Sequence, residues 1–260
     1  MDNSTDLRDK VALVTGATSG LGEATARQLA GRGAQVVMCG RREEMGLAVE
    51  RSIKAAGGNA TFIRADVTER AEIEALIDRT MGSFGRLDCA VNNAGVLGPA
   101  LTPIADVEEA QWDEVMNTNL RGLWLCMKFE IPAMLQGGSG SIVNLSSIYG
   151  IKGSEVGHGP YSATKHAVIG LTRSAAIDYG GQGLRINAVA PGFSHSEIVD
   201  GFMEQAPDLT NALVARHSSQ DRVAESHEQA AAITWLCSAS ASYVNGAVLV
   251  VDVGPTTRLY

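Results

Sequence analysis

Short runs of consecutive apolar residues recur along the chain, and segments with helical spacing of apolar positions separate them. Runs such as VALV, VVM and IVNL do not alternate with polar residues, which is typical of strands buried on both faces of a sheet. We therefore expect strands over residues 10–15, 34–39, 61–65, 87–92, 141–146, 184–189 and 247–251.

The segments between these runs predict helices over residues 21–32, 43–56, 69–82, 107–135, 161–179 and 228–238. We expect the longest of them to break near residues 117–119 and again near Pro132, because proline lacks the N–H that a helix interior needs. Alternation of strand and helix predicts a parallel sheet with helices on both faces. The expected fold is therefore α/β, a doubly wound Rossmann-type sheet in three layers, forming a single domain over residues 1–260.

Two segments interrupt this alternation. Residues 150–160 are rich in glycine and join a strand to a helix. Residues 192–226 form a far longer connection than usual, and they follow the carboxyl end of a strand, where ligands bind in this fold class. We expect them to form a mobile lid. Ile198, Phe202 and Met203 share a helical face, which predicts one short helix; packing of this face onto the core is the alternative.

The charge balance narrows the range of partners. The chain has 21 Lys and Arg against 29 Asp and Glu, a formal net charge of −8. An acidic chain without a basic cluster argues against nucleic acid binding. No apolar stretch approaches the roughly 18 residues of a membrane span, and the polar residues 1–10 argue against a signal peptide. We expect a cytoplasmic protein without a membrane partner.

The four cysteines are Cys39, Cys89, Cys126 and Cys237. They form no C-x-x-C pair and lie in apolar contexts, so we interpret them as buried, reduced thiols. We expect no metal site.

A glycine-rich loop, Thr-Gly-Ala-Thr-Ser-Gly-Leu-Gly, lies between the first strand and the first helix. A sharp turn and a close approach of phosphate both need residues without a Cβ, and the following helix directs unpaired N–H groups at the ligand. The spacing differs from G-x-G-x-x-G and lacks the lysine of a P-loop. We predict that a dinucleotide binds here, at Gly16, Ser19, Gly20, Leu21 and Gly22.

The tip of the second strand bears on the choice of cofactor. An acidic residue there would bond a ribose 2′-hydroxyl, whereas an arginine accommodates a 2′-phosphate. The strand ends in Gly40, followed by Arg41 and Arg42. This favours NADP(H), with NAD(H) as the alternative, because Glu43 and Glu44 could neutralise the arginines. Arg41 and Arg42 could also be surface residues at the start of a helix.

Tyr161 and Lys165 are four residues apart on a predicted helix, which places them on one face. A nearby ammonium favours the phenolate, so the pair can serve as a general acid/base. Ser146 and Ser147 end the preceding strand, where a hydroxyl could polarise a carbonyl. A tyrosine and a lysine four residues apart also occur by chance in many helices, and serines at a strand end are also typical of turns.

Together these motifs resemble those of the classical short-chain dehydrogenases/reductases, from about Asp9 to Gly254. The matching segments are the glycine-rich loop, Asp66 with Val67, the Asn-Asn-Ala-Gly run that ends at Gly95, Asn119, Ser146 with Ser147, Tyr161 with Lys165, and Pro191 with Gly192.

The resemblance implies four catalytic residues. Tyr161 would be the acid/base, and Lys165 would bind the nicotinamide ribose and lower the tyrosine pKa. Ser147 would hold the substrate oxygen, and Asn119 would support a proton-relay water. Tyr161 follows Ser147 by one residue more than is usual in the family, so an insertion within residues 150–160 leaves Ser146 as the alternative.

The resemblance also implies further cofactor contacts. Asp66 and Val67 would lie at the adenine. The remaining contacts would come from Asn93, Ala94, Gly95, Tyr161, Lys165, Pro191, Gly192, Ser194 and Ser196. Ser19 stands where relatives that prefer NADP(H) often have a basic residue. Near the C-terminus, Asp-Val-Gly replaces the common Asp-Gly-Gly, a segment at a subunit contact in many relatives; a homo-oligomer, dimer or tetramer, is expected.

The sequence thus predicts an oxidoreductase that moves a hydride between a nicotinamide dinucleotide and a small secondary alcohol or ketone. The alternatives are a dinucleotide-binding sensor or scaffold without turnover, which Tyr161 and Lys165 disfavour, and halohydrin cleavage, whose enzymes usually lose the glycine-rich loop. The substrate stays open. Loop residues that could face it or be solvated are His158, His195, His217, Glu155 and Glu197.

Overall fold

The computed structural model describes residues 6–205, 207–217, 220 and 222–257. In this part of the chain, a seven-stranded parallel sheet has the order β3-β2-β1-β4-β5-β6-β7. The strands are β1 (Val11–Thr15), β2 (Gln35–Gly40), β3 (Asn59–Arg64), β4 (Cys89–Asn92), β5 (Gly140–Leu145), β6 (Leu184–Pro191) and β7 (Val248–Val251). The doubly wound prediction is confirmed. The chain ends, 1–5 and 258–260, lie outside the described residues.

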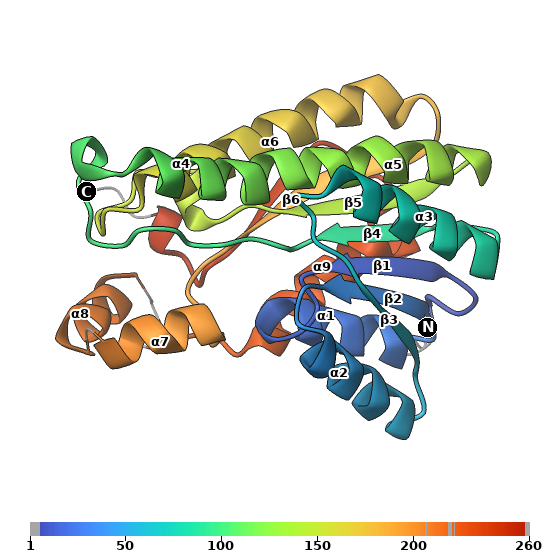
Figure 1. Cartoon of the computed structure of the whole chain (residues 1–260), viewed down its shortest axis with the longest axis horizontal. Helices are drawn as coiled ribbons and strands as arrows, with labels where there is room; N and C mark the ends of the chain where they lie inside the picture. The colour runs from blue at the N-terminus through green and yellow to red at the C-terminus, as the bar shows by residue number, and fades with distance from the viewer. Residues whose placement is uncertain (1–5, 206, 218–219, 221, 258–260) are drawn as a thin grey trace.

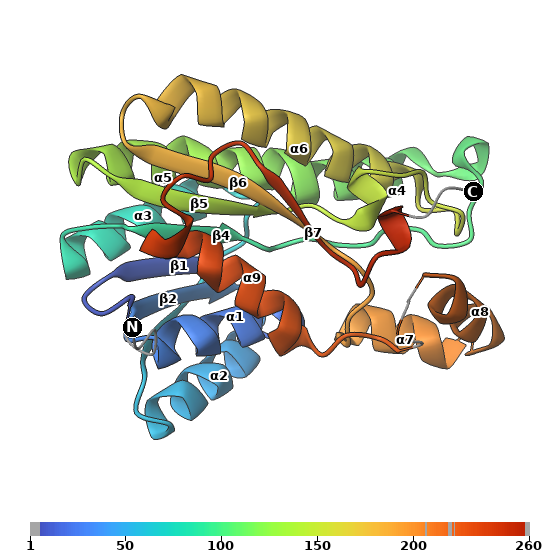
Figure 2. The ribbon, with the colours of Figure 1, turned by 180° about the vertical axis from the view of Figure 1, so that it is seen from behind.

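Helices cover both faces of the sheet (Figures 1 and 2). One face carries α1 (Gly20–Gly31), α2 (Glu43–Ala55) and α9 (Ser226–Cys237). The other face carries α3 (Arg70–Phe84), α4 (Glu109–Met116), α5 (Leu123–Gln136) and α6 (Gly159–Gly180). These are the three predicted layers.

The two faces of the sheet have separate apolar cores. Val11 and Leu13 of β1 pack with α3, α5 and α6, whereas Ala12 and Val14 pack with α1, α2 and α9. Successive side chains of a strand point to opposite faces. Burial on both sides therefore explains why the strand sequences are continuously apolar.

The predicted break of the long helix near residues 117–119 is a π-helical segment, Asn117–Gly122, that joins α4 to α5. The break expected at Pro132 was wrong, because α5 continues through it to Gln136. The residue one turn earlier, Lys128, is exposed. Pro132 has no N–H to donate to the carbonyl of Lys128, and water can bind this carbonyl because the residue is exposed. The buried side chains of Ile131 and Met134 keep the helix packed on the core.

Residues 192–226 contain two helices rather than the single one expected, α7 (Glu197–Gln205) and α8 (Pro207–His217). They lie apart from the three layers, at the end of the sheet where the strands have their carboxyl ends (Figure 1). The side chains of Ile198 and Phe202 lie outside the described part, as do residues 206, 218–219 and 221. The apolar face and the motion of a lid stay predictions.

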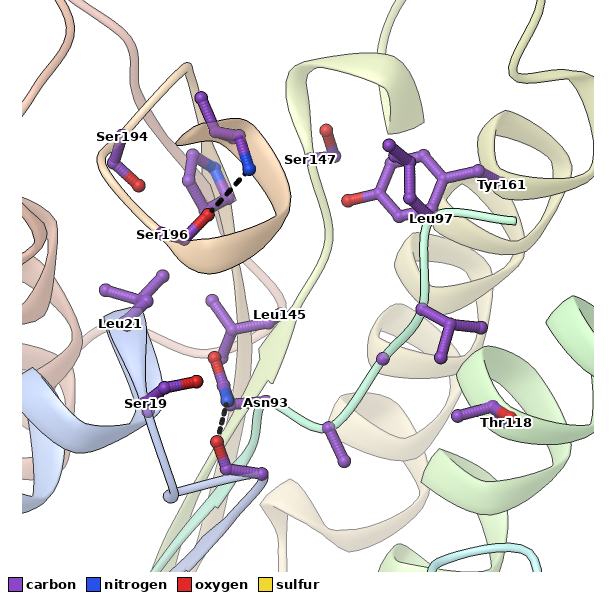
Figure 3. A pocket seen from close by; sticks show the side chains of 18 of the residues that line it. Ser19, Leu21, Asn93, Leu97, Thr118, Leu145, Ser147, Tyr161, Ser194 and Ser196 are labelled. Atoms are coloured by element: carbon purple, nitrogen blue, oxygen red, sulfur yellow. Dashed lines mark hydrogen bonds between the residues drawn. The ribbon is translucent and has the colours of Figure 1, made fainter. Parts of the chain in front are cut away.

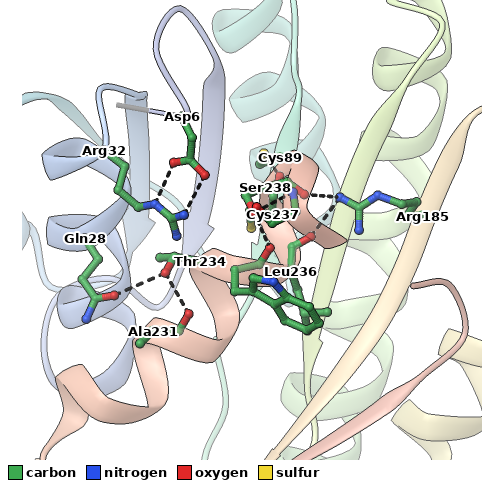
Figure 4. Close-up of polar contacts among 12 residues, drawn as sticks. Asp6, Gln28, Arg32, Cys89, Arg185, Ala231, Thr234, Leu236, Cys237 and Ser238 are labelled. Carbon is green, nitrogen blue, oxygen red and sulfur yellow. Dashed lines mark hydrogen bonds and ion pairs between the residues drawn. The ribbon is translucent and has the colours of Figure 1, made fainter. Parts of the chain in front are cut away.

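Polar contacts attach α9 to the rest of the fold (Figure 4). The guanidinium of Arg185, in β6, donates to the carbonyls of Leu236 at 2.9 Å, Ser238 at 3.2 Å and Ala241 at 3.0 Å. Arg185 thereby joins β6 to the end of α9 and to the turn that follows it. The Thr234 hydroxyl donates to the side chain of Gln28 in α1 at 3.3 Å.

The four cysteines are free and buried, as predicted. None of the described helices is long and apolar enough to cross a membrane.

Candidate active site

A cavity of about 500 Å³ opens at the carboxyl ends of the strands. It extends from the tips of β2 and β3, past the loop between β1 and α1, to Tyr161 of α6. Figure 3 shows the part between Ser19 of that loop and Tyr161. All residues predicted to bind the cofactor line it: Gly16, Ser19, Gly20, Leu21, Gly22, Arg41, Arg42, Asp66, Val67, Asn93, Ala94, Gly95, Tyr161, Lys165, Pro191, Gly192, Ser194 and Ser196.

The β1–α1 loop has the shape that its glycines permit. Gly16 and Gly20 have positive φ angles of 65° and 55°. A Cβ at Gly16 would lie 2.8 Å from the Cα of Ala94, and a Cβ at Gly22 would collide with the carbonyl oxygen of Gly16. Asn93 secures the turn, because its Nδ2 donates to the carbonyls of Thr15 at 3.1 Å and Gly16 at 3.0 Å. The loop leaves backbone exposed to the cavity.

The two arginines differ in their surroundings. Arg42 lies across the glycine-rich loop, and its Nη2 donates to the hydroxyls of Thr18 at 2.8 Å and Ser19 at 2.7 Å. The side chain of Arg41 is 59% exposed, and its Nη1 lies 4.0 Å from the carboxylate of Asp66. A Cβ at Gly40 would lie 2.9 Å from Cγ2 of Thr18, so Thr18 opposes any side chain at this strand tip.

Lys165 lies beneath Tyr161 on α6. Its Nζ donates to the carbonyl of Leu145 at 2.8 Å and lies 5.4 Å from the centre of the tyrosine ring. Burial lowers the pKa of Lys165 to about 8. Burial also raises the pKa of Tyr161, and a hydrogen bond with Ser147 offsets only part of the rise. The lowering of the tyrosine pKa by Lys165, which the resemblance implies, stays a prediction.

The two adjacent serines have different partners. The hydroxyl of Ser146 donates to the carbonyl of Lys165 at 2.8 Å and so ties β5 to α6. The hydroxyl of Ser147 accepts from the backbone N–H of Tyr149 at 3.1 Å and bonds Tyr161. Figure 3 shows Ser147 and Tyr161 at the same end of the cavity.

Asn119 is buried in the π-helical segment, and it is the one predicted catalytic residue that does not line the cavity. Its Oδ1 accepts from the N–H of Val96 at 2.8 Å, and its Nδ2 donates to the carbonyl of Val96 at 2.8 Å. Asn119 thereby positions the loop that contains Gly95. Its part in a proton relay stays a prediction.

The loop residues that could face the substrate or be solvated differ in their burial. His158 is buried and lines the cavity, with its ring 6.0 Å from that of Tyr149 and 6.4 Å from that of Tyr161. Burial lowers the pKa of His158 to about 4, so it is neutral. His195 is exposed and its Nδ1 lies 2.8 Å from Asp200.

Sequence reasoning missed most of the wall around Tyr161. These residues lie in loops, at strand ends, in the π-helical segment, in α7 and in α9, and nothing in the sequence distinguishes most of them from core residues. The further lining residues are Thr18, Gly40, Ala65, Val96, Leu97, Thr118, Leu145, Ile148, Tyr149, Val156 and Gln229, together with Phe193 and Val199 of the expected lid, which the sequence offered as an apolar wall.

Comparison with known proteins assigns the family. Residues 16–256 match the family model described as enoyl-(acyl carrier protein) reductase. The chain is 43% identical over 251 residues to the A-factor type gamma-butyrolactone 1'-reductase (1S-forming) of Streptomyces virginiae, with 96% of each chain covered. The chain belongs to the short-chain dehydrogenase/reductase family.

Other members of the short-chain dehydrogenase/reductase family are equally similar. The chain is 44% identical over 248 residues to the cis-4-hydroxycyclohexanecarboxylate dehydrogenase of Sinomonas cyclohexanicum, covering 95% of this chain and 97% of that one. The crystal structure of levodione reductase superposes with a TM-score of 0.92 at 36% identity, covering 97% and 99% of the two chains. Like these short-chain dehydrogenases/reductases, the protein is an oxidoreductase that uses a nicotinamide dinucleotide.

Proposed function

We propose that this oxidoreductase interconverts a secondary alcohol and a ketone with NADP(H), using Tyr161 as general acid/base. One observation carries the proposal: the Tyr161 hydroxyl lines the cavity beside Ser147, in a site that continues to the glycine-rich loop. A dinucleotide sensor or scaffold would need the loop but not this pair of hydroxyls.

A dinucleotide fits the residues present. The loop at Gly16 and Gly22 has no room for a Cβ, so its backbone is accessible to a pyrophosphate at the start of α1. When bound, the nicotinamide dinucleotide supplies or accepts the hydride. Asp66, whose carboxylate is oriented by the N–H and hydroxyl of Thr68 at 2.9 Å, would hold the adenine end. Ser194 and Ser196 would hold the nicotinamide end.

The residues around Tyr161 would move the proton. Tyr161 donates its proton to the substrate oxygen during reduction and accepts one during oxidation. Ser147 orients that oxygen together with the tyrosine hydroxyl. Lys165, held by the carbonyl of Leu145, fixes the ribose and the tyrosine.

Two observations support NADP(H) over NAD(H). Arg42 and the hydroxyls of Thr18 and Ser19 form one cluster of donors beside the strand tip. Arginine binds phosphate through paired, charge-assisted hydrogen bonds. A Cβ at Gly40 would lie 2.9 Å from Cγ2 of Thr18, so an acidic residue at this strand tip would require Thr18 to move.

The names of two relatives support a small ring-bearing substrate. One is a gamma-butyrolactone 1'-reductase and the other a cis-4-hydroxycyclohexanecarboxylate dehydrogenase. The aromatic wall of Tyr149 and Phe193, whose rings are 6.3 Å apart, suits a compact apolar ring.

We also propose that the protein is a cytoplasmic homo-oligomer, a dimer or tetramer. The four free thiols support a reducing compartment. Trp112 of α4 and Trp124 of α5 are 38% and 44% exposed, and β7 ends the sheet with Val250 37% exposed. Light scattering at micromolar concentration tests this assembly, and a monomer would contradict it.

A panel of cyclic and open-chain ketones and secondary alcohols tests the proposed activity. Each compound is assayed with both cofactors, and the absorbance of the reduced nicotinamide is followed. We expect turnover of cyclic compounds with NADP(H). Cofactor binding without turnover of any compound would support the sensor.

A further inference from the structure

The part of the cavity around Tyr161 has a nearly uncharged wall. Its apolar side chains come from the loops after β4, β5 and β6 and from α7; they are Leu97, Ile148, Tyr149, Val156, Phe193 and Val199. Four charged side chains among the described residues line the cavity as a whole, namely Arg41, Arg42, Asp66 and Lys165.

None of these four charges is placed to pair with the body of a substrate. Arg41, Arg42 and Asp66 lie at the tips of β2 and β3, at the other end of the cavity. Lys165 lies between Tyr161 and β5, where its ammonium donates to the carbonyl of Leu145. The exposed residue Glu155 carries a carboxylate next to Val156 of this wall, and it helps burial to raise the pKa of Tyr149 to about 12.

His158 is a polar group within this wall, and it is neutral. It packs edge-to-face between Tyr149 and Tyr161 and is only 4% exposed. A neutral imidazole can bond an uncharged oxygen but offers an anion no opposite charge.

We propose that this wall selects uncharged substrates: ketones and alcohols with an apolar body, whose second polar group, where there is one, is an uncharged oxygen or amide. Carboxylates are excluded because a buried ion without a partner is far costlier than a buried neutral amide, and Glu155 adds like charge beside Tyr149. The inference rests on the proposed function and adds the substrate's charge class to it; from the relative named for a cyclohexanecarboxylate it takes the ring and not the charge.

A matched pair of substrates isolates charge from shape. The compounds 4-oxocyclohexanecarboxamide and 4-oxocyclohexanecarboxylate have nearly the same size and differ by one unit of charge. We expect kcat/KM for the carboxamide to exceed that for the carboxylate on the order of a hundredfold.

Glu155→Lys sharpens the test, because this exposed residue does not line the cavity and its replacement reverses the charge beside Tyr149. We expect the variant to raise kcat/KM for the carboxylate several-fold and to leave the carboxamide unchanged. Glu74→Lys, an equal change of charge on the exposed surface of α3, should alter neither. Equal rates for the two substrates, or a faster carboxylate, would overturn the inference while upholding the proposed function. Absence of turnover of every ketone, in protein that still binds cofactor, would overturn the proposed function itself.

Discussion

The guanidinium of Arg42 donates to the hydroxyl of Ser19 across the glycine-rich loop, at 2.7 Å from Nη2 to Oγ. In the sequence alone, Ser19 counted against NADP(H), since it stands where a basic residue is common. In the fold, Ser19 adjoins the arginine that follows the second strand. The loop and the strand tip together form a cationic site that neither segment forms alone.

Replacing Arg42 by Gln should lower kcat/KM for NADP(H) roughly 10- to 100-fold, because a charge-assisted contact to phosphate is lost. Activity with NAD(H) should change little. Steady-state kinetics with both cofactors measures this. Arg41→Gln is the matched control: its side chain is exposed and lies 4.0 Å from Asp66, so the loss should be smaller. Equal values for the two cofactors in the unmodified protein would refute the preference.

Tyr161→Phe should remove nearly all turnover and keep cofactor affinity. The variant retains the ring that packs against His158 but loses the hydroxyl that exchanges the proton. General acid/base groups contribute 10²- to 10⁴-fold. Turnover and cofactor binding, the latter by fluorescence titration, are measured on the same preparation. A variant that keeps more than about a tenth of kcat would contradict the assignment.

Replacing Ser147 by Ala should affect catalysis, whereas replacing Ser146 by Ala should affect stability. Ser147→Ala should lower kcat strongly with little change in melting temperature, because its hydroxyl bonds Tyr161. Ser146→Ala removes the bond that ties β5 to the carbonyl of Lys165 in α6, so it should lower stability by about 1 kcal/mol. Kinetics and thermal unfolding of both variants test this division. A larger loss of kcat in Ser146→Ala, at unchanged stability, would make Ser146 the catalytic serine.

Much of this fold can be predicted from the sequence, because strands buried on both faces of the sheet have continuously apolar sequences. Continuous apolar runs and glycines such as Gly16 and Gly22 have few other physical causes. Pro132 shows the limit: local propensity predicts a break, but packing of Ile131 and Met134 on the core prevails.

The site was predictable where chemistry demands particular residue types. Tyr161, Lys165 and Arg42 carry functional groups that sequence can single out, whereas Tyr149 and Val156 are indistinguishable from core residues until the loops are placed. The partners of Ser146 and Ser147 likewise depend on a contact between β5 and α6 that no local pattern encodes.

A polar network lies inside the apolar core beneath the cavity. The carboxylate of Glu130, in α5, is fully buried and accepts from Nδ2 of Asn92 at 3.0 Å. The same Nδ2 donates to Asn144 at 3.0 Å, and Asn144 donates to Thr172 at 3.0 Å. Burial raises the pKa of Glu130 from 4.5 to about 7.

The contribution of Glu130 to folding stability should therefore fall as pH rises from 4.5 to about 7, the window between its unfolded and folded pKa values. In that window the folded state holds a proton that the unfolded state has released, so rising pH favours unfolding. At about 1.4 kcal/mol per unit, the loss is about 3 kcal/mol. His158, whose pKa burial lowers from 6.5 to about 4, contributes in the opposite sense between those two values, so the comparison with Glu130→Gln isolates the part due to Glu130. Urea unfolding at pH 5 and pH 8 measures it. Glu130→Gln should remove the loss, whereas the exposed Glu114→Gln should keep it; equal pH dependence in all three proteins would refute the role of Glu130.

The segment after β6 should move as a lid whose first residues are fixed. Nε2 of Gln229 donates to the carbonyl of Gly192 at 3.1 Å, and the hydroxyl of Ser226 donates to the carbonyl of His195 at 2.6 Å. These two bonds attach the segment to α9 before α7 begins. We expect α7 and α8 to open and close beyond this attachment and to exclude water from the site when closed. Hydrogen exchange followed across residues 192–226 should be fast in α7 and α8 of the free protein and slower with NADP(H), while residues 192–196 stay protected. Exchange in both helices as slow as in the core strands, and unchanged by cofactor, would refute the lid.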